Sequence, residues 1–192
     1  MGLPTPPKPV KLFVALLAND PTLFAQSAAQ LQSLYGPIDL ESEIFPWEMT
    51  TYYRKEMGEH LLRKFVTFAT LIAPDALANI KLATNALEIS LSGGESPTSP
   101  RRINLDPGYV DATKLVLASA KNQAHRIYLS QGIYAEVTLL YHHGEFHPFV
   151  YTYADYQWPE TYAFLRRVQN RHREQLRAIK NADSRPTRPT SF

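Results

Sequence analysis

Two closely spaced carboxylates are the first groups in the sequence that could do chemistry. Glu41 and Glu43 lie two positions apart in a run, 38–45, that is typical of a strand, so both should point to one face. Such a pair could hold a hard cation such as Mg²⁺, with phosphate oxygens completing the coordination shell. The alternative is that both carboxylates lie on a solvated face of the sheet, where most charged residues are found.

Glu136 is a second candidate, because it interrupts a strand pattern that is otherwise apolar and aromatic. A charge at this place must face solvent, a partner or a cavity. Asn104 and Asp106 share a face if their strand continues that far, and Glu136 could join them as a general base or metal ligand. Glu136 and Asp106 are therefore the candidate catalytic residues. The alternative is a charge on the wet face of a hairpin.

Cationic groups are concentrated between Arg101 and Arg126, where six lie within 26 residues. Convergent cations of this kind suit a phosphate or carboxylate ligand. Their positions at strand ends are also where soluble proteins ordinarily keep charges. If the cluster is functional, its candidate ligand-binding residues are Arg101, Arg102, Asn104, Lys114, Lys121, His125 and Arg126.

Several kinds of chemistry are excluded by the sequence. There is no cysteine, so disulfides, thiolate catalysis and zinc–thiolate sites cannot occur. No phosphate-binding P-loop motif is present, and no dinucleotide-binding glycine motif follows a strand. The nucleophile elbow of the α/β-hydrolases and the aromatic RNA-binding strand motif are also missing.

The elements that must position these residues follow from hydrophobic periodicity. The run 11–17 is continuously apolar, as expected of a strand covered on both faces. A helix should begin at Pro21, with Asp20 as its cap, and end at Gly36. Strands at 38–45 and 62–69 and a helix from Pro74 to Gly93 follow. With a strand up to Leu105, the order is the βαββαβ pattern of ferredoxin-like folds.

The second half of the chain is typical of antiparallel strands followed by a helix. Short turn signals separate its apolar runs: Asp106-Pro107-Gly108 predicts a tight turn, and Ser130-Gln131-Gly132 a hairpin. The last helix should start at Pro159, with its arginines largely off the apolar stripe. The predicted fold is therefore α+β, with a ferredoxin-like βαββαβ front half, an antiparallel strand extension and a C-terminal helix.

We expect a single domain, with charge divided unevenly along the chain. Residues 1–9 should be a flexible lead, 10–181 one α+β domain and 182–192 a disordered tail. From Arg166 onward eight Lys and Arg face two acids, a local net charge of +6, whereas the preceding residues carry −4. A basic end of this kind could meet nucleic acid or an acidic partner, or could simply be solvated.

The sequence favours a protein that does not enter a membrane. No apolar run approaches the roughly 20 residues needed to cross a bilayer. The proline-rich N-terminus lacks the apolar segment of a signal peptide, which favours the cytoplasm.

Several segments together resemble a known family. They are GPIDLESEIFPWEMTTYY, IKLATNALE, TYADY and the long block RRINLDPGYVDATKLVLASAKNQAHRIYLSQGIYAEVTLLY. The family is bacterial and archaeal, and its domain is called the domain of unknown function number four-four-one-six. The resemblance covers about residues 10 to 170 and implies one domain. Some members are labelled "GTP-binding protein", which no motif in this sequence supports, and the resemblance assigns no role to individual residues.

Two hypotheses of function follow, and they leave open whether the protein is an enzyme. In the first, the protein binds a phosphorylated, nucleotide-like small molecule and could turn it over, with Mg²⁺ as a cofactor. Replacing Glu136 by Gln should then abolish the response to ligand and leave the fold nearly intact. In the second, the protein is an interaction module whose basic C-terminal helix binds RNA or an acidic protein.

Overall fold

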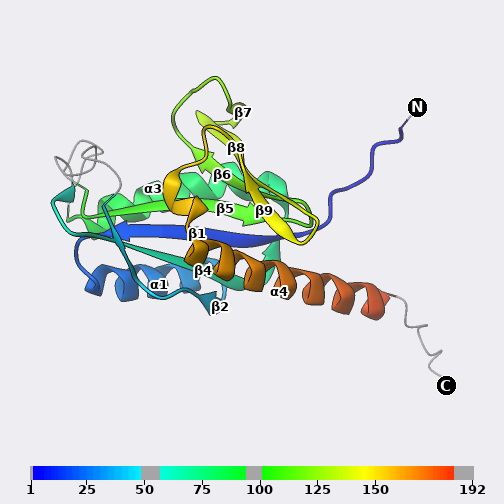
Figure 1. Cartoon of the computed structure of the whole chain (residues 1–192), viewed down its shortest axis with the longest axis horizontal. Helices are drawn as coiled ribbons and strands as arrows, with labels where there is room; N and C mark the ends of the chain where they lie inside the picture. Colours follow the sequence, from blue (N-terminus) through cyan, green and yellow to red (C-terminus); the bar gives the residue numbers. More distant parts are fainter. Residues whose placement is uncertain (1, 49–56, 94–100, 184–192) are drawn as a thin grey trace, which may run out of the picture.

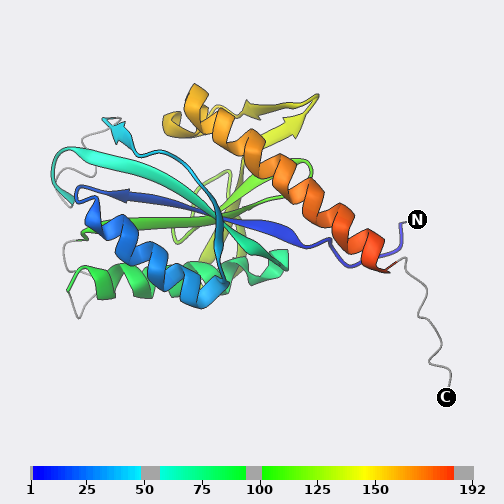
Figure 2. The same ribbon diagram turned by 90° about the horizontal axis from the view of Figure 1, so that it is seen from below.

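One antiparallel sheet runs through the chain, with helices packed on both of its faces (Figures 1 and 2). The computed structural model describes residues 2–48, 57–93 and 101–183. In these ranges the strands are β1 (Val10–Ala18), β2 (Ile38–Glu41), β3 (Phe45–Trp47), β4 (Leu61–Ile72), β5 (Ile103–Val110), β6 (Lys114–Ser119), β7 (Ile127–Ser130), β8 (Ile133–His142) and β9 (Glu145–Pro148). The helices are α1 (Thr22–Tyr35), α3 (Leu77–Leu91) and α4 (Pro159–Asp183), with short 3-10 turns η1 (Pro74–Ala76) and η2 (Ala154–Gln157).

The sheet order is β2-β4-β1-β5-β6-β8-β7, with β3 paired to β4 and β9 paired to β8. All of these neighbouring strands are antiparallel. The three strands predicted at 11–17, 38–45 and 62–69 share this one sheet. The α+β class, the antiparallel pairing of the strands and the C-terminal helix are therefore confirmed.

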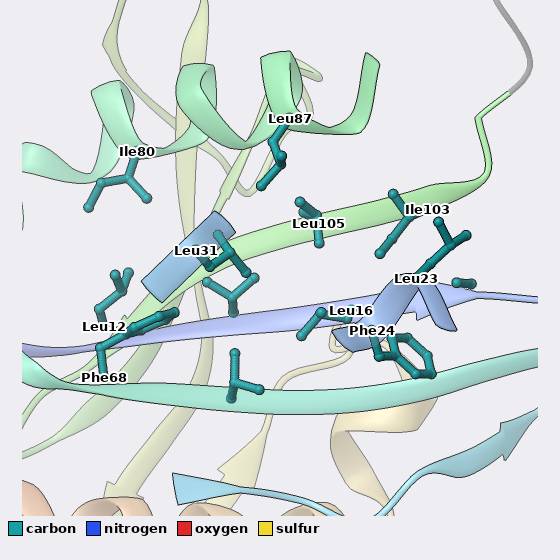
Figure 3. Packing of buried hydrophobic residues seen from close by; sticks show 13 residues of the cluster. Leu12, Leu16, Leu23, Phe24, Leu31, Phe68, Ile80, Leu87, Ile103 and Leu105 are labelled. Atoms are coloured by element: carbon teal, nitrogen blue, oxygen red, sulfur yellow. The ribbon is translucent and has the colours of Figure 1, made fainter. Parts of the chain in front are cut away.

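Each face of the sheet has its own hydrophobic core because β1 is apolar at nearly every position and buried throughout. Its alternate side chains point to opposite faces. Leu12 and Leu16 pack with α1 and α3 on one face, as Figure 3 shows. Phe13 and Ala15 pack with η2 and α4 on the other. The prediction of a strand covered on both faces is confirmed.

A buried polar network under α4 accompanies the second core. The ammonium of Lys11, on β1, is fully buried and donates to Asp39 of β2, to the Phe68 carbonyl at 2.6 Å and to Gln175 of α4 at 3.0 Å. Burial lowers the pKa of Lys11, and the hydrogen bond and charge of Asp39 oppose that change. The network ties α4 to three strands of the sheet.

Two local predictions are wrong. The strand expected over 38–45 is divided into β2 and β3, because Ser42 leaves the strand: its N–H donates to the Phe65 carbonyl and its hydroxyl accepts from the Phe65 N–H. The turn expected at 106–108 does not form, and β5 runs straight through these residues. Pro107 and Gly108 instead affect the pairing of β5 with β6.

The sheet splits between β5 and β6. These strands pair only over Gly108–Val110 and Leu115–Leu117, whereas β5 continues along β1 as far as Ile103 and β6 continues along β8 as far as Ser119. On the open edge of β5, the Leu105 N–H donates to the carboxylate of Glu88 at 2.6 Å, and the Leu105 carbonyl accepts from Lys81 at 2.8 Å. Two side chains of α3 thus replace a neighbouring strand.

Pro107 and Gly108 explain where the split begins. Backbone groups alternate in direction along a strand, so position 107 faces the same edge as Leu105, and a proline there has no N–H to donate. At Gly108 the strands approach so closely that a Cβ would lie 2.2 Å from the Val116 carbonyl oxygen. The two residues therefore bring β5 and β6 into contact and end their pairing.

The described residues at the two ends of the chain differ in structure. Residues 2–9 form no helix or strand, and α4 continues to Asp183. The part of the predicted tail that lies beyond Asp183 is outside the described residues. Within the described ranges, no helix has the length and apolar character needed to span a membrane.

We predict that Gly108→Ala lowers the free energy of unfolding by about 3 kcal/mol, because the added methyl group must push apart two paired backbones. Chemical denaturation measures the change. Gly132→Ala is the control: a Cβ there meets nothing within 4 Å, but φ is +76°, so backbone strain alone applies. That strain costs about 1 kcal/mol. Equal losses in the two variants would contradict the close approach at Gly108.

Candidate functional site

The hydroxyl of Tyr156 is buried on the α4 face of the sheet, within the influence of a cluster of charged residues. Its ring packs on Phe13 and Phe65, with ring centroids 6.3 and 5.9 Å away. The residue is 2% exposed, and its hydroxyl has no hydrogen-bond partner among the described residues. The short turn η2 holds it there, because the Thr161 hydroxyl donates to the Asp155 carbonyl at 2.7 Å.

Charges from four elements act on this hydroxyl. Burial raises the pKa of Tyr156 well above its usual value; Arg63 on β4 opposes the rise, and Asp106, Asp155 and Glu136 add to it. Tyr156 is therefore a neutral phenol at physiological pH. It can donate one hydrogen bond and accept others.

Arg63 and Asp155 form a buried ion pair, 2.7 Å between Nη2 and Oδ2, beside this ring. Asp155 also accepts a hydrogen bond from the indole N–H of Trp47 at 3.2 Å. Charges this deeply buried are stable only when paired and hydrogen-bonded. The pair therefore fixes η2 against β3 and β4.

Glu136 is buried and does not lie on a wet face of the hairpin. It is 4% exposed, and its Oε2 accepts from Arg126 Nε at 2.7 Å. Arg126 also donates to the Ser119 hydroxyl, the Lys121 carbonyl and the Tyr153 hydroxyl. This ion pair holds the segment between β6 and β7 against β8.

His125 completes a pair that could move a proton. Its Nε2 lies 3.0 Å from Glu136 Oε2, and its ring stacks on Tyr151 with 4.1 Å between centroids and 10° between planes. When Nε2 carries the proton and donates to Glu136, Nδ1 is left as an acceptor. A carboxylate that orients an imidazole in this way is a common acid–base arrangement.

The other side of the split carries a second charged set on β5 and α3. Lys81 lies 3.5 Å from Asp106 and 3.9 Å from Glu88. Burial raises the pKa of Glu88, and the nearby Lys81 opposes that rise. Asn104 accepts from Arg101 at 3.0 Å and donates to Asp106. The charge of Asp106 also raises the pKa of Tyr156, so this set acts on the same hydroxyl.

The structure brings some of the residues proposed from sequence together in two sets and leaves the others apart. Arg101, Asn104 and Asp106 lie together on the β5 side, and Lys121, His125, Arg126 and Glu136 on the β8 side. Two cations lie apart from both sets: Arg102 pairs with Asp20 at 3.4 Å, and Lys114 pairs with Asp111 at 2.6 Å at the opposite end of β6.

The proposed metal pair also lies elsewhere. Glu41 ends β2 and pairs with Lys64 at 2.8 Å, and Glu43 follows the strand rather than sharing its face. In the part of the chain that the structure describes, no three histidines or carboxylates are grouped so that they could hold a metal ion.

Sequence reasoning did not find five residues of the cluster: Arg63, Lys81, Glu88, Asp155 and Tyr156. Lys81 and Glu88 are seven positions apart on a helix and therefore share a face, a signal that was available. Asp155 and Tyr156 lie in the segment TYADY, which carried part of the family resemblance. The burial of Arg63 depends on long-range packing and has no local signal.

The fold and the cluster define an α+β protein with an open antiparallel sheet and a buried, mixed-charge site at a split in that sheet. The family model for "Domain of unknown function (DUF4416)" matches residues 8–172. The chain therefore belongs to this family, as the resemblance implied. Comparisons with curated proteins and with solved structures found nothing that matches.

The buried ion pair changes the expectation for Glu136→Gln. Arg126 and Glu136 side chains are each 2% exposed, so the neutral amide leaves a buried guanidinium without its counter-charge. We predict a loss of about 3 kcal/mol in the free energy of unfolding, measured by urea denaturation.

Glu41→Gln is the matched control, because Glu41 pairs with Lys64 at a site where its side chain is 59% exposed. It should change stability by less than about 1 kcal/mol. An equally small effect of Glu136→Gln would show that the Arg126 pair is not buried in solution.

Proposed function

We propose that the protein binds a phosphorylated, nucleotide-like small molecule beside the Tyr156 hydroxyl, in the split between β5 and β6. The observation that carries the proposal is this hydroxyl, which is buried among charged residues with no hydrogen-bond partner in the described ranges. A buried polar group without a partner costs about 1–3 kcal/mol. A ligand that bonds to it would remove that cost.

The charges around Tyr156 decide how such a ligand would lie. Each of the three carboxylates has a cation beside it: Arg63 for Asp155, Arg126 for Glu136 and Lys81 for Asp106. A phosphate placed among them would displace an ion pair. The uncharged polar part of the ligand, such as sugar hydroxyls, is therefore expected next to the phenol.

The phosphate is expected at the margin of the cluster. The side chains of Arg101 and His125 are 27% and 21% exposed, more open than the buried cations. Arg is well suited to a bidentate contact with phosphate. Asp106, 30% exposed, is the carboxylate that a phosphate-bound Mg²⁺ could reach.

Turnover is a further possibility of the same site. The His125–Glu136 pair could take a proton from an attacking water or hydroxyl, with Nδ1 of His125 as the acceptor. Asp106, the other candidate catalytic residue, would act through the metal or directly on the ligand.

The front half of the fold is interpreted as a ferredoxin-like unit. The order β2-β4-β1-β5, with antiparallel neighbours and with α1 and α3 on one face, supports this interpretation. Strands β6 to β9 would then be an extension added beyond β5, and the ligand site would lie at the junction of unit and extension.

Thermal unfolding with added ligands tests the proposal, because a ligand of the native state raises apparent stability. The panel is inorganic phosphate, ribose 5-phosphate, AMP, ADP, ATP, GDP and GTP at millimolar concentration, with and without Mg²⁺, and adenosine as the unphosphorylated control. At least one phosphorylated compound should raise the melting temperature of the wild type. No shift with any of them would contradict the proposal.

We predict that Tyr156→Phe removes this response. Without ligand the variant should be about 1 kcal/mol more stable than the wild type, because a buried hydroxyl without a partner is removed. Tyr35→Phe is the matched control: the Tyr35 hydroxyl is also buried with no partner in the part of the chain that the structure describes, but its ring lies on the opposite face against Phe68. Tyr35→Phe should keep the full ligand response. An unchanged response in Tyr156→Phe would place the ligand elsewhere.

A further inference from the structure

The outer surface of α4 carries a row of cations. Helical residues advance by about 100° each, so positions 166, 170, 173, 177 and 180 fall on one stripe. The stripe consists of Arg166, Asn170, Arg173, Arg177 and Lys180, all of them exposed. It contains no acidic residue. The buried side of the helix, with Leu165, Val168 and His172, points to the sheet.

One edge of α4 is neutralised by acidic side chains. Arg171, on the side toward β2, lies 3.2 Å from Asp39 and 3.5 Å from Glu174. Among the described residues, Arg166, Arg173 and Arg177 form no ion pair. Arg173 instead lies over the ring of Tyr141, with 5.1 Å from Cζ to the centroid, which positions its guanidinium and leaves its charge uncompensated.

The position of the helix makes the stripe accessible. Figure 2 shows that the last turns of α4 extend beyond the sheet, and residues 177–182 are all exposed. From Arg166 to Lys180 the stripe is about 21 Å long, at a rise of about 1.5 Å per residue. A linear array of this length can contact several consecutive phosphates of an extended polyanion.

We propose that this stripe binds the phosphate backbone of nucleic acid. Charge complementarity selects a polyanion, and the composition of the stripe selects against a protein partner. Protein interfaces depend on buried apolar or aromatic anchors, and the stripe has none. Contacts of cations to phosphates position a nucleic acid without reading its sequence, so binding is expected to be sequence-independent. The proposal does not depend on the ligand site near Tyr156.

Fluorescence anisotropy with labelled single-stranded RNA and labelled duplex DNA tests it, with the full chain at a series of salt concentrations. The wild type should bind both probes at low salt and weaken as salt rises, because phosphate contacts release counterions. The triple variant Arg166→Gln, Arg173→Gln, Arg177→Gln should lose at least tenfold in affinity at low salt. Its log–log salt slope for RNA should fall by about 2, from about 0.7 for each lost contact.

The control is Lys64→Gln, Arg167→Gln, Arg171→Gln, which removes the same charge from positions off the stripe. It should lose less than threefold, and circular dichroism should show both variants folded. Three results would overturn the proposal: no binding by the wild type at low salt, equal losses in the two triple variants, or binding of poly-glutamate as tight as binding of RNA. The last result would assign the stripe to an acidic protein.

Discussion

The short pairing between β5 and β6, which stops at Gly108, is the constraint on which the rest of the molecule depends. Pro107 has no N–H to donate on that edge, so the strands separate there. The backbone groups of Leu105 therefore need other hydrogen-bond partners. α3 supplies them with a charged residue of each sign. Because Lys81 and Glu88 are charged, ion pairs line the open edge of β5, and Asp106 belongs to the same network.

Charged residues are also paired on the β8 side of the split. Arg126 and Glu136 are buried together, and Arg126 also donates hydrogen bonds to Ser119, Lys121 and Tyr153. Buried ion pairs seldom stabilise a fold more than apolar residues of the same size would. Several such pairs around one hydroxyl that has no partner among the described residues therefore support the proposed ligand site. The cations of the α4 stripe, by contrast, are exposed to solvent.

The sequence predicted what depends on local pattern and missed what depends on packing. The apolar run of β1, the hairpin at Ser130-Gln131-Gly132 and the helix beginning at Pro159 were each recoverable from periodicity and turn residues. Asp106-Pro107-Gly108 has the composition of a turn, but it lies inside β5. The effect of its proline and glycine is on the pairing with β6, which depends on the neighbouring strand and not on the local sequence. The burial of Glu136 was an open alternative, since a period of two cannot tell which face is covered. The roles of Arg63 and Tyr156 could not be predicted, because they depend on how η2 packs on the sheet.

The central claim is that the split at β5 and β6 receives a ligand at Tyr156. Amide NMR spectra of the isotopically labelled protein, recorded while the compound that gives the largest thermal shift is titrated in, test it most directly. The account predicts saturable shifts that converge on Asp106, Ser119, Glu136 and Tyr156, on both walls of the split and around the buried hydroxyl. Shifts confined to α4, or spread over the surface without saturation, would contradict it.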